Sequence, residues 1–492
     1  MKQSPLKARG SWGWLAGILA LTCSLLPASG PTTRQPPNII FILADDLGWA
    51  ELGCYGNSFN ETPNLDRMAR QGVRFTEAYA AAPVCSPYRA SFLTGQYPAR
   101  HGILDYLRPN TASPLSIDHV TLAEMLSKNG YATCMIGKWH LSGYRYHGAA
   151  RELRATDHGF DEELASEVKG VGNGANFWPY VFRTQPIRWL NIRENRLGKE
   201  EYLVDRMNHE AVQFIERNRK RPFFLYLSHY ATHSILNGKP AIVEKYRRKH
   251  PPGKSTRKRC YLCQDAGQQG DPGNHWAPDH NPHLAAMLES IDDGVGMILE
   301  KLKELKLDHN TLVVFSSDNG GESQVTSNAP LRGGKSSLYE GGIRVPLVVQ
   351  WPAVVPAGKT CSTPTSNIDF YPTFLDTAGI TPSAKQKLDG RSILAHLKEP
   401  GDIPRTTPLF WHYPLARPHF LGGHSGGAIR KGPWKLIEWF DTKKVELFNL
   451  QDDPSEKNNL FAQQEQTAGR LLAELRAWRK ELGAKTTVEK KN

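Results

Sequence analysis

Residues 38–46 read NIIFILADD, an apolar run that ends in two carboxylates. Runs of this kind, without polar alternation, are typical of strands buried on both faces of a parallel sheet. Four more segments have the same character, at residues 131–136, 222–227, 311–315 and 345–350. We therefore expect an α/β fold whose central sheet is mostly parallel.

Amphipathic patterns with helical spacing separate these runs. They lie at residues 63–71, 122–128 and 283–305, and the first two are followed by Gly72 and Gly130. Glycine is common just after a helix because it accepts the left-handed backbone conformation. The alternation of strands and helices predicts one large domain over residues 31–380, with helices flanking the sheet.

The pattern changes near residue 380, where residues 381–387 are polar and lack periodicity. Alternating β-type segments follow at residues 427–430, 434–440 and 443–450, and a helical stripe of Leu and Trp at 469–482 closes the chain. These features predict a smaller α+β subdomain over residues 381–492, with an antiparallel sheet and a C-terminal helix.

Composition excludes several protein classes. The 492 residues include 61 Lys and Arg against 49 Asp and Glu, a formal net charge of +12, and 39% of them are hydrophobic. This apolar content suffices for a core and excludes disordered and collagen-like chains. A basic balance favours an anionic partner. Because no nucleic-acid-binding motif accompanies the charge, we expect no nucleic acid partner.

The first thirty residues look like a leader. Three basic residues precede an apolar run at residues 14–26, and small residues follow at 28–30. This order is typical of a secretory signal peptide over residues 1–30, since the run is shorter than the ~20 residues of a membrane span. Loss of Lys2, Lys7 and Arg9 lowers the net charge from +12 to +9.

We therefore expect an exported protein, periplasmic or secreted. Lipid attachment at Cys23 is an alternative, but Thr22 before it is larger than the residue usual there. No later stretch is long and apolar enough to span a membrane, so we expect no integral membrane segment after the leader is removed.

Export places the cysteines in an oxidising compartment, where disulfides are allowed. Six cysteines remain besides Cys23, too few for a disulfide framework: Cys54, Cys85, Cys134, Cys260, Cys263 and Cys361. Proximity favours a pair between Cys260 and Cys263. The same two residues, followed by His275 and His280, have a spacing close to that of a zinc finger, so an exported zinc-binding protein is a non-enzyme alternative.

Polar side chains follow two of the predicted strands. Asp45 and Asp46 come after the first run, and Asp318 and Asn319 after the fourth. Ligands of parallel α/β sheets bind beyond the carboxyl ends of the strands. Carboxylate and amide oxygens suit Ca²⁺ or Mg²⁺. Either cluster alone could be a turn signal, but two at matching strand ends favour a metal site.

Basic side chains follow the other runs. Lys138 and His140 come after the second, His229 and His233 after the third, and Lys335 lies in the glycine-rich loop LRGGK. A metal ion surrounded by Lys and His is typical of a site for an oxyanion such as phosphate or sulfate.

Residues 85–95 read CSPYRASFLTG and carry the most specific pattern in the chain. Ser86 and Pro87 predict the first turn of a helix, with Cys85 at its positive end and Arg89 on the same face. A cysteine in this position is expected to have a depressed pKa and to be a candidate nucleophile. The alternative is a buried structural cysteine.

C-x-P-x-R followed by x-x-x-L-T-G, at Cys85 to Gly95, resembles the signature of type I sulfatases in the alkaline-phosphatase superfamily. The resemblance extends over residues 38–450 through PNIIFILADDLG, TPNLDRMARQGVRFTEAY, GKWHL, HGFD, AAMLESIDDGVG, SSDNGG and LRGGKSSLYEGGIRVP. One position departs from the pattern, since Thr232 stands where a proline often precedes the histidine. The resemblance implies an alkaline-phosphatase-like fold whose C-terminal subdomain completes the substrate pocket.

The resemblance also implies a modified nucleophile and a metal. A maturation enzyme would oxidise Cys85 to Cα-formylglycine, whose hydrate attacks sulfur. One Ca²⁺, or Mg²⁺, would be bound by four residues: Asp45, Asp46, Asp318 and Asn319.

Roles for the remaining residues follow from the same resemblance. Lys138 and Lys335 would neutralise the sulfate oxygens, and His233, assisted by Lys335, would protonate the leaving alcohol. His140 would take the proton of the second hydroxyl of the hydrate so that sulfate is released, and Arg89 would orient the formylglycine.

The substrate is inferred from the C-terminal segments. FWHYP and AIRKGPWKLIEWF are similar to segments of bacterial sulfatases that act on polysaccharide fragments, and His412 and His424 are possible substrate-binding residues. We expect an exo-acting sulfatase of a sulfated polysaccharide or glycosaminoglycan fragment. The alternatives are a broad arylsulfatase and a phosphonate or phosphodiester hydrolase of the same superfamily.

Much of the positive charge lies in one segment. Seven basic residues occur there without an acidic residue between them: Arg247, Arg248, Lys249, Lys254, Arg257, Lys258 and Arg259. The segment is a solvated loop or a contact for a polyanionic chain, so a polyanion-binding exported protein is a further non-enzyme alternative.

Overall fold

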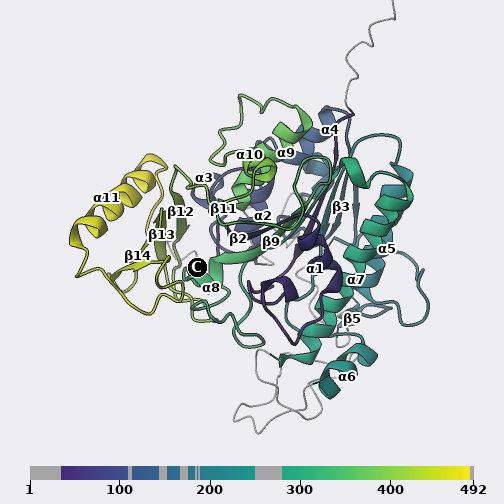
Figure 1. The fold of residues 1–492 in the computed structure, drawn as a ribbon, viewed down its shortest axis with the longest axis horizontal. Coiled ribbons are helices and arrows are strands. Elements are labelled where there is room, and N and C mark those ends of the chain that lie inside the picture. Colours follow the sequence, from purple (N-terminus) through teal and green to yellow (C-terminus); the bar gives the residue numbers. More distant parts are fainter. Residues whose placement is uncertain are drawn as a thin grey trace, which may run out of the picture. The chain divides into compact units, whose positions relative to one another are not determined.

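Nine strands form one sheet in the computed structural model, in the order β10-β2-β9-β8-β1-β7-β3-β4, with β11 paired to β2 (Figure 1). The structure describes residues 35–108, 114–142, 152–166, 176–182, 185–186, 189–249 and 280–487. The strands are β1 (Asn38–Ala44), β2 (Val73–Tyr79), β3 (Ala132–Gly137), β4 (Glu162–Leu164), β7 (Phe223–Ser228), β8 (Thr311–Ser317), β9 (Arg344–Gln350), β10 (Lys359–Cys361) and β11 (Thr365–Ser366).

The centre of the sheet is parallel. β1 pairs with β7 on one side and β8 on the other, and β3 extends the parallel set beyond β7. In this register Leu43 lies between Ser228 and Ser316, so the carboxyl ends of the strands meet at one edge. All five predicted runs are strands, and every residue of β1 is buried, as expected for a strand with helices on both faces.

One of these strands was expected to be parallel and is not. β9 runs antiparallel to both β8 and β2. A parallel return requires a crossover, usually a helix of several turns. Between β8 and β9 the structure has α8 (Glu340–Ile343), a helix of four residues, so the chain returns through a loop in the opposite direction.

Helices cover both faces of the sheet (Figure 1). Ile40 and Ile42 pack in a core with α1 (Pro63–Arg70), α5 (Leu203–Arg217) and α7 (Pro282–Glu304). Phe41 faces the opposite way because successive side chains of a strand alternate. It packs with residues of α2 (Cys85–Thr94), α4 (Leu122–Lys128) and α9 (Phe370–Ala378). The remaining α-helices of this part are α3 (Pro98–His101), α6 (Pro240–Lys249) and α10 (Leu394–Lys398).

A second, antiparallel sheet follows in the order β12-β13-β14-β15. Its strands are β12 (Leu409–Tyr413), β13 (Gly426–Lys431), β14 (Trp434–Trp439) and β15 (Val445–Asn449). Leu471 and Leu475 of α11 (Glu465–Glu481) pack against one face of this sheet. The three predicted β segments and the final helix are confirmed, whereas β12 was not recognised as a strand.

Short elements complete the described chain. They are the hairpin β5 (Val181–Phe182) and β6 (Gln185–Pro186) and 3-10 turns at Gly53–Tyr55, Ala155–His158, Asp308–Asn310 and Asn367–Asp369.

The described residues from Pro36 onward form one compact unit, and the domain boundary near residue 380 stays a prediction. The predicted signal peptide, with Cys23, lies outside the described residues. Within the described part, no helix is both long and apolar enough to cross a bilayer.

Candidate active site

The four predicted metal ligands come together at the carboxyl edge of the sheet. Asp45 and Asp46 follow β1, and Asp318 and Asn319 follow the adjacent strand β8. The backbone N–H of Asp46 donates to Asp318 Oδ1 at 3.1 Å, and Asn319 Nδ2 donates to Asp46 Oδ1 at 2.8 Å. None of the four is more than 2% exposed, so three carboxylates share one buried volume.

Three cationic side chains face these carboxylates. Lys138 Nζ lies 2.5 Å from Asp45 Oδ2, and Lys335 Nζ lies 2.6 Å from Asp46 Oδ2. Arg89 Nη2 lies 2.7 Å from Asp318 Oδ2. Buried charges require partners of this kind, because each unpaired ion would cost several kcal/mol in lost hydration.

The balance of charge leaves room for a divalent cation. Burial, together with the charge of Asp318, raises the pKa of Asp45, so negative charge is crowded at this point. Asn319 Oδ1 is buried and accepts no hydrogen bond from the described residues. Oxygen atoms of Asp45 and Asp318 lie within 4.8 Å of each other and of Cys85 Sγ. A set of hard oxygen donors with one unsatisfied carbonyl fits Ca²⁺ or Mg²⁺.

A bound divalent cation would also make the site positive. Three carboxylates already face three cationic side chains, so the two added charges would exceed the negative charge of these three carboxylates. Such a pocket favours an anionic substrate, which agrees with the oxyanion expected from the sequence.

Cys85 is the first residue of α2, as predicted, and its Sγ lies 3.4 Å from Lys138 Nζ. The expected depression of its pKa is wrong. Burial raises the pKa of Cys85 to about 12, and the charges of Lys138 and Lys335 lower it only in part. The side chain is removed from water, and this cost outweighs the helix end and both lysines. The unmodified thiol is therefore protonated and a poor nucleophile.

Arg89 lies one helical turn after Cys85 and holds the site together. Besides Asp318, its guanidinium donates to the carbonyl oxygen of Lys138 at 2.8 Å and to Ser228 Oγ. Ser228 ends β7 and was not singled out from the sequence. Its position in SHYATH, directly before His229, was the available signal.

His233 and Lys335 form a pair beside Asp46. Lys335 Nζ lies 3.0 Å from His233 Nε2, while His233 Nδ1 contacts the carbonyl oxygen of Ser234. Because a carbonyl only accepts, Nδ1 carries the hydrogen and Nε2 accepts from Lys335. Burial and the charge of Lys335 lower the pKa of His233 to about 3. Burial lowers the pKa of Lys335, but Asp46, Cys85 and Asp45 together outweigh burial, so the pKa is raised.

His140 follows Lys138 by two residues and contacts Leu107. Its Nε2 lies 3.0 Å from the carbonyl oxygen of Leu107, so Nε2 carries the hydrogen and Nδ1 carries the lone pair. Burial, followed by the charges of Lys138 and Arg89, lowers the pKa of His140 well below its usual value. The imidazole is neutral and able to accept a proton.

A carboxyl group close to the site was also missed. Glu322 Oε2 accepts a hydrogen bond from Ser234 Oγ at 2.6 Å, next to His233. Burial, followed by the charge of Asp46, raises the pKa of Glu322. Glu322 directly follows the quoted SSDNGG segment, three residues after Asn319, but a single Glu in a loop carries no distinctive pattern.

The two histidines expected to bind substrate lie elsewhere. His412 is buried in β12, where its Nε2 lies 3.1 Å from the carbonyl oxygen of Lys485 and its ring contacts Phe440. His424 is half exposed and contacts Asp441 Oδ2 at 2.8 Å. His419, in the same glycine-rich stretch, is the histidine on whose pKa Lys335 and Asp46 act. The contacts given for His412 and His424 are thus with residues of the C-terminal part and not with the cluster.

Other predicted features fall partly outside the described residues. Cys260, Cys263 and His275 lie outside them, and the ring of His280 packs on Phe59 at 5.0 Å. Of the seven basic residues, only the three at the end of α6 are described: Arg247, Arg248 and Lys249.

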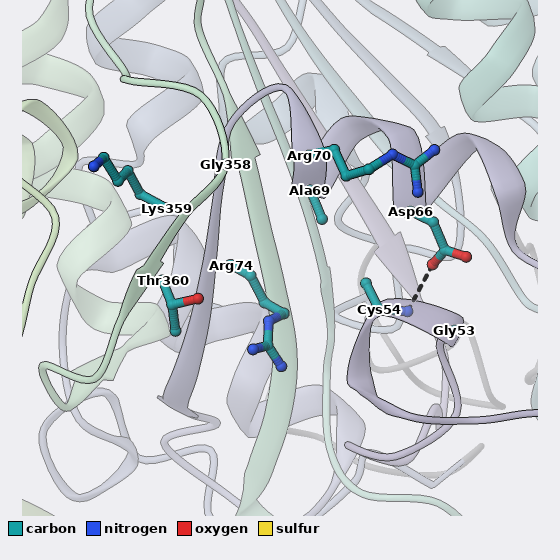
Figure 2. A pocket seen from close by; sticks show the side chains of 9 residues that line it. All are labelled: Gly53, Cys54, Asp66, Ala69, Arg70, Arg74, Gly358, Lys359 and Thr360. Atoms are coloured by element: carbon teal, nitrogen blue, oxygen red, sulfur yellow. Dashed lines mark hydrogen bonds between the residues drawn. The ribbon is translucent and has the colours of Figure 1, made fainter.

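A separate pocket of about 310 Å³ lies at the opposite edge of the sheet. Its lining includes Arg74 at the start of β2 and Lys359 at the start of β10 (Figure 2). Cys54 also lines it, and the backbone N–H of Cys54 donates to Asp66 Oδ1 at 2.7 Å. None of the predicted site residues borders this pocket, so the chemistry expected from the sequence belongs to the carboxyl edge.

Comparisons with known proteins agree with this arrangement. The sulfatase family matches residues 37–380, and the family described as N-sulphoglucosamine sulphohydrolase, C-terminal, matches residues 334–481. Steryl-sulfatase of Mus musculus is 34% identical, over 82% of this chain and 72% of the relative. N-acetylgalactosamine-6-sulfatase of Canis lupus familiaris is also 34% identical, over 90% of this chain and 79% of the relative. The solved structure of Ps i-CgsB in complex with k-i-k-neocarrahexaose has a TM-score of 0.75 at 30% identity, over 92% of this chain and 94% of that one.

Proposed function

Because the chain belongs to the sulfatase family and is a sulfuric ester hydrolase, we propose that it removes sulfate from a sulfated saccharide through a formylglycine made from Cys85. The observation that carries the proposal is the position of Cys85. Its Sγ lies beside Lys138 and within 4.8 Å of oxygen atoms of Asp45 and Asp318. An atom attached at this position meets both the cationic side chains and the carboxylates that would hold a metal.

Modification explains why the cysteine can be so deeply buried. With a pKa of about 12, the thiol itself does not supply a thiolate near neutral pH. A hydrated formylglycine supplies two hydroxyl groups on one carbon, so a sulfuryl group can be accepted by one oxygen and released with the help of the other. The proposal therefore includes a maturation enzyme that recognises the segment CSPYR.

Lys138 and Lys335 bind the sulfate oxygens. Each ammonium group already lies within 2.6 Å of a carboxylate oxygen, so both are held in place before the substrate arrives. Donors fixed in a buried site stabilise developing charge without reorganisation. Arg89 is fully enclosed by the Asp318 carboxylate and the Lys138 carbonyl, and it orients this set rather than contacting solvent.

Two parts of the site transfer protons: Lys335 and His233 act on the leaving alcohol, and His140 acts on the hydrated formylglycine. The hydrogen bond between Lys335 Nζ and His233 Nε2 supports a proton on Lys335 and a lone pair on His233, so we propose that Lys335 is the proton source for the leaving alcohol and that His233 orients Lys335. This reverses the order implied by the resemblance, in which His233 donates. On the other side, the lone pair of His140 Nδ1 accepts the proton of the second hydroxyl.

Asp45, Asp46, Asp318 and Asn319 would hold one divalent cation, which we propose to be Ca²⁺. Three carboxylates and a free carbonyl oxygen favour the larger ion, because Mg²⁺ usually keeps several waters and the four side chains here are buried. The cation would supply positive charge to the sulfate group and hold the three carboxylates ionised.

The substrate class rests on similar proteins and on the charge of the site. The relative named N-acetylgalactosamine-6-sulfatase and the structure that contains k-i-k-neocarrahexaose support a sulfated saccharide, and we propose exo action on a polysaccharide or glycosaminoglycan fragment. A steroid or aryl sulfate is the alternative, supported by the similarity to steryl-sulfatase. The leader-like residues 1–30 support export to the periplasm or the medium.

A panel of single substrates tests the proposal. Matured protein is incubated with singly sulfated saccharides, an aryl sulfate, a steroid sulfate and a phosphonate ester, and the released sulfate or phosphonate is measured. We expect the highest kcat/KM for one of the saccharides. A higher kcat/KM for the aryl or steroid sulfate than for every saccharide would contradict the proposed substrate class.

A further inference from the structure

A tight turn next to Lys335 places one histidine beside the active site. The N–H of His419 donates to the carbonyl oxygen of Gly423 at 2.7 Å, and the N–H of Gly422 donates to that of His419 at 2.8 Å. Gly423 packs so closely on the neighbour of Lys335 that an added Cβ would lie 1.9 Å from the carbonyl oxygen of Ser336. The turn is therefore seated directly on the loop that carries Lys335.

The imidazole of His419 presents a hydrogen-bond donor that nothing in the described chain uses. Its Nδ1 accepts from the backbone N–H of Leu421 at 3.2 Å, so Nε2 carries the hydrogen. Burial, followed by the charges of Lys335 and Arg108, lowers the pKa of His419 to about 4, so the ring is neutral. His419 is 7% exposed, and its Nε2 has no partner among the described residues. A buried donor without a partner destabilises the free protein unless a ligand accepts from it.

The segment Asp105 to Arg108 packs against this turn through Tyr106. The N–H of Leu107 donates to Ser86 Oγ at 3.0 Å, and the carbonyl oxygen of Leu107 accepts from His140. The segment is thus fixed between the neighbour of Cys85 and His140. The ring of Tyr106 packs on the ring of His419, with the two ring centroids 5.6 Å apart. The guanidinium of Arg108 lies 4.3 Å from the centre of the Tyr106 ring.

Two exposed groups extend from this contact. Phe420 is 75% exposed and stacks on the ring of His419 with centroids 4.4 Å apart. The side chain of Arg108 is 54% exposed and pairs with Asp105 at 3.1 Å. A half-solvated guanidinium and an exposed aromatic face, joined through Tyr106 and His419, combine a stacking surface with a site for an anion.

We propose that His419, Phe420 and Arg108 form a subsite for a saccharide that carries a second anionic group besides the scissile sulfate. Nε2 of His419 donates to an oxygen of the sugar ring that bears the scissile sulfate, and Phe420 stacks on a sugar ring. Arg108 pairs with the second anionic group, a sulfate or a carboxylate on the same saccharide. The inference rests on the proposed function and narrows its substrate class to polyanionic saccharides.

The role of Arg108 is tested with three matched disaccharides. The first carries one sulfate, the second carries an additional sulfate on the neighbouring sugar, and the third carries a uronic acid carboxylate there instead. We expect Arg108→Ala to raise KM about tenfold or more for the second or the third, or for both, and to leave the first nearly unchanged. Preference between the second and the third identifies the second group as sulfate or carboxylate.

Arg217→Ala is the matched control for charge. The side chain of Arg217 is 53% exposed and pairs with Glu162 at 3.0 Å, which resembles the situation of Arg108, but it lies at the end of α5. Equal kinetics of Arg108→Ala and Arg217→Ala on all three disaccharides, at normal wild-type release of sulfate, would overturn the subsite alone. Absence of sulfate release from all three by the wild type would overturn the proposed function, and the subsite with it.

His419 and Phe420 are tested by conservative exchange. We expect His419→Ala to lower kcat/KM about tenfold on the singly sulfated disaccharide and His419→Gln, which keeps a donor, to restore most of it. Phe420→Ala is expected to raise KM on all three, whereas Phe461→Ala, at another exposed phenylalanine, has no effect. No rescue by His419→Gln, together with equal effects of Phe420→Ala and Phe461→Ala, would overturn the subsite.

Discussion

Two buried clusters of the molecule each set three carboxylates against three cationic side chains. The site cluster lies at the carboxyl edge of the large sheet and consists of Asp45, Asp46, Asp318, Arg89, Lys138 and Lys335. The interface cluster lies where the large sheet meets the C-terminal sheet and consists of Glu77, Glu340, Glu456, Arg344, Arg430 and Lys435. By charge alone the two cannot be told apart.

Ion pairs and hydrogen bonds hold the interface cluster together. Glu340 Oε1 lies 2.9 Å from Lys435 Nζ, and Glu340 Oε2 accepts from Tyr79 Oη at 2.7 Å. Glu456 Oε1 lies 2.8 Å from the same Lys435, and its Oε2 accepts from the N–H of Glu340 at 2.6 Å. The side chains of Glu340, Glu456 and Lys435 are fully buried. Each of these carboxylate oxygens faces a protein cation or donor, although Glu456 Oε1 forms only the ion pair with Lys435 and no hydrogen bond among the described residues. The group ties the second sheet to the loop after Lys335.

At the site cluster, one oxygen atom has no partner in the described part of the chain and two side chains are partly exposed to solvent. Next to this cluster, Asn319 Oδ1 lacks a partner among the described residues, and the side chains of Lys335 and of the neighbouring His233 are 9% and 14% exposed. The difference teaches that buried charge by itself does not mark a functional site. What marks it is the gathering of carboxylate oxygens around Cys85 at one edge of the sheet, next to Asn319 Oδ1, which is unpaired within the described structure.

The largest expected effect is a loss of activity when a carboxylate of the site cluster, but not of the interface cluster, is replaced. Asp318→Asn removes one charge from the site cluster with little change of shape, and we expect a loss of about 10³-fold in kcat/KM for a sulfated substrate. Glu340→Gln makes the same change in the interface cluster, and we expect its folded fraction to keep near-normal kcat. The measurement is sulfate release, with far-ultraviolet circular dichroism to establish folding. Equal losses in the two folded variants would contradict the comparison.

The second effect concerns stability. Glu340→Gln leaves Lys435 and Arg344 without their full counter-charge in a buried place, which should lower the free energy of unfolding by about 3 kcal/mol. Urea unfolding measures this value. Lys431→Ala, at the end of β13, breaks an exposed pair with Glu474 of α11, and as the control it should cost less than about 1 kcal/mol. A loss of unfolding free energy for Glu340→Gln as small as that for Lys431→Ala would show that the interface cluster does not stabilise the contact between the two sheets.

The third effect concerns the metal. Chelation should lower the melting temperature of the wild type, and Ca²⁺ at about 100 times its Kd should restore about 2.7 kcal/mol of stability. Because the oxygen donors that suit Ca²⁺ gather around Cys85 in the site cluster, Glu340→Gln should keep this response and Asp318→Asn should lose it. Differential scanning calorimetry with and without Ca²⁺ provides the readout. If Ca²⁺ stabilised Asp318→Asn as much as it stabilises the wild type, the metal would not bind at the site cluster.

The smallest effect is a pH dependence of the interface cluster. Burial, partly offset by Lys435, raises the pKa of Glu456 to about 7. The folded protein therefore binds this proton more tightly than the unfolded chain, and the stabilisation is complete below the unfolded pKa and is lost as the pH rises through about 7.

Glu456→Gln cannot titrate and serves as the reference. Between pH 5 and pH 8 we expect the wild type to lose about 2 kcal/mol of unfolding free energy relative to this variant, measured by urea unfolding at each pH. If the difference in unfolding free energy between the two proteins stayed constant from pH 5 to pH 8, or grew in favour of the wild type, the pKa of Glu456 would not be raised in the folded protein.

The fold was predictable where the sequence pattern is continuous. The runs that became β1, β3, β7, β8 and β9 are apolar throughout because helices cover both faces, and the ends of β1 and β8 therefore located the predicted metal ligands. The direction of β9 was not predictable, because it depends on the length of α8 and not on the strand itself.

The site was less predictable where burial or alternation decides the outcome. The pKa of Cys85 depends on how completely α2 is covered, which no local motif states. His412 was misplaced because β12 was not recognised: alternation sends Trp411 and Tyr413 to the face that packs on Leu338, and His412 to the other. His419 lies in a turn without periodicity, and its role depends on contacts with Ser336 and Tyr106 that are distant in sequence.

The central claim is that Cys85 in the site cluster acts as formylglycine, and the mass of the peptide that contains Cys85 tests it most directly. Protein matured in its native host is digested, and the mass spectrum of this peptide is compared with the rate of sulfate release by the same preparation. The account predicts that the side chain CH₂–SH is replaced by CHO in the active fraction, and that sulfate release rises in proportion to this fraction. An active preparation that contains only the unmodified thiol would contradict it.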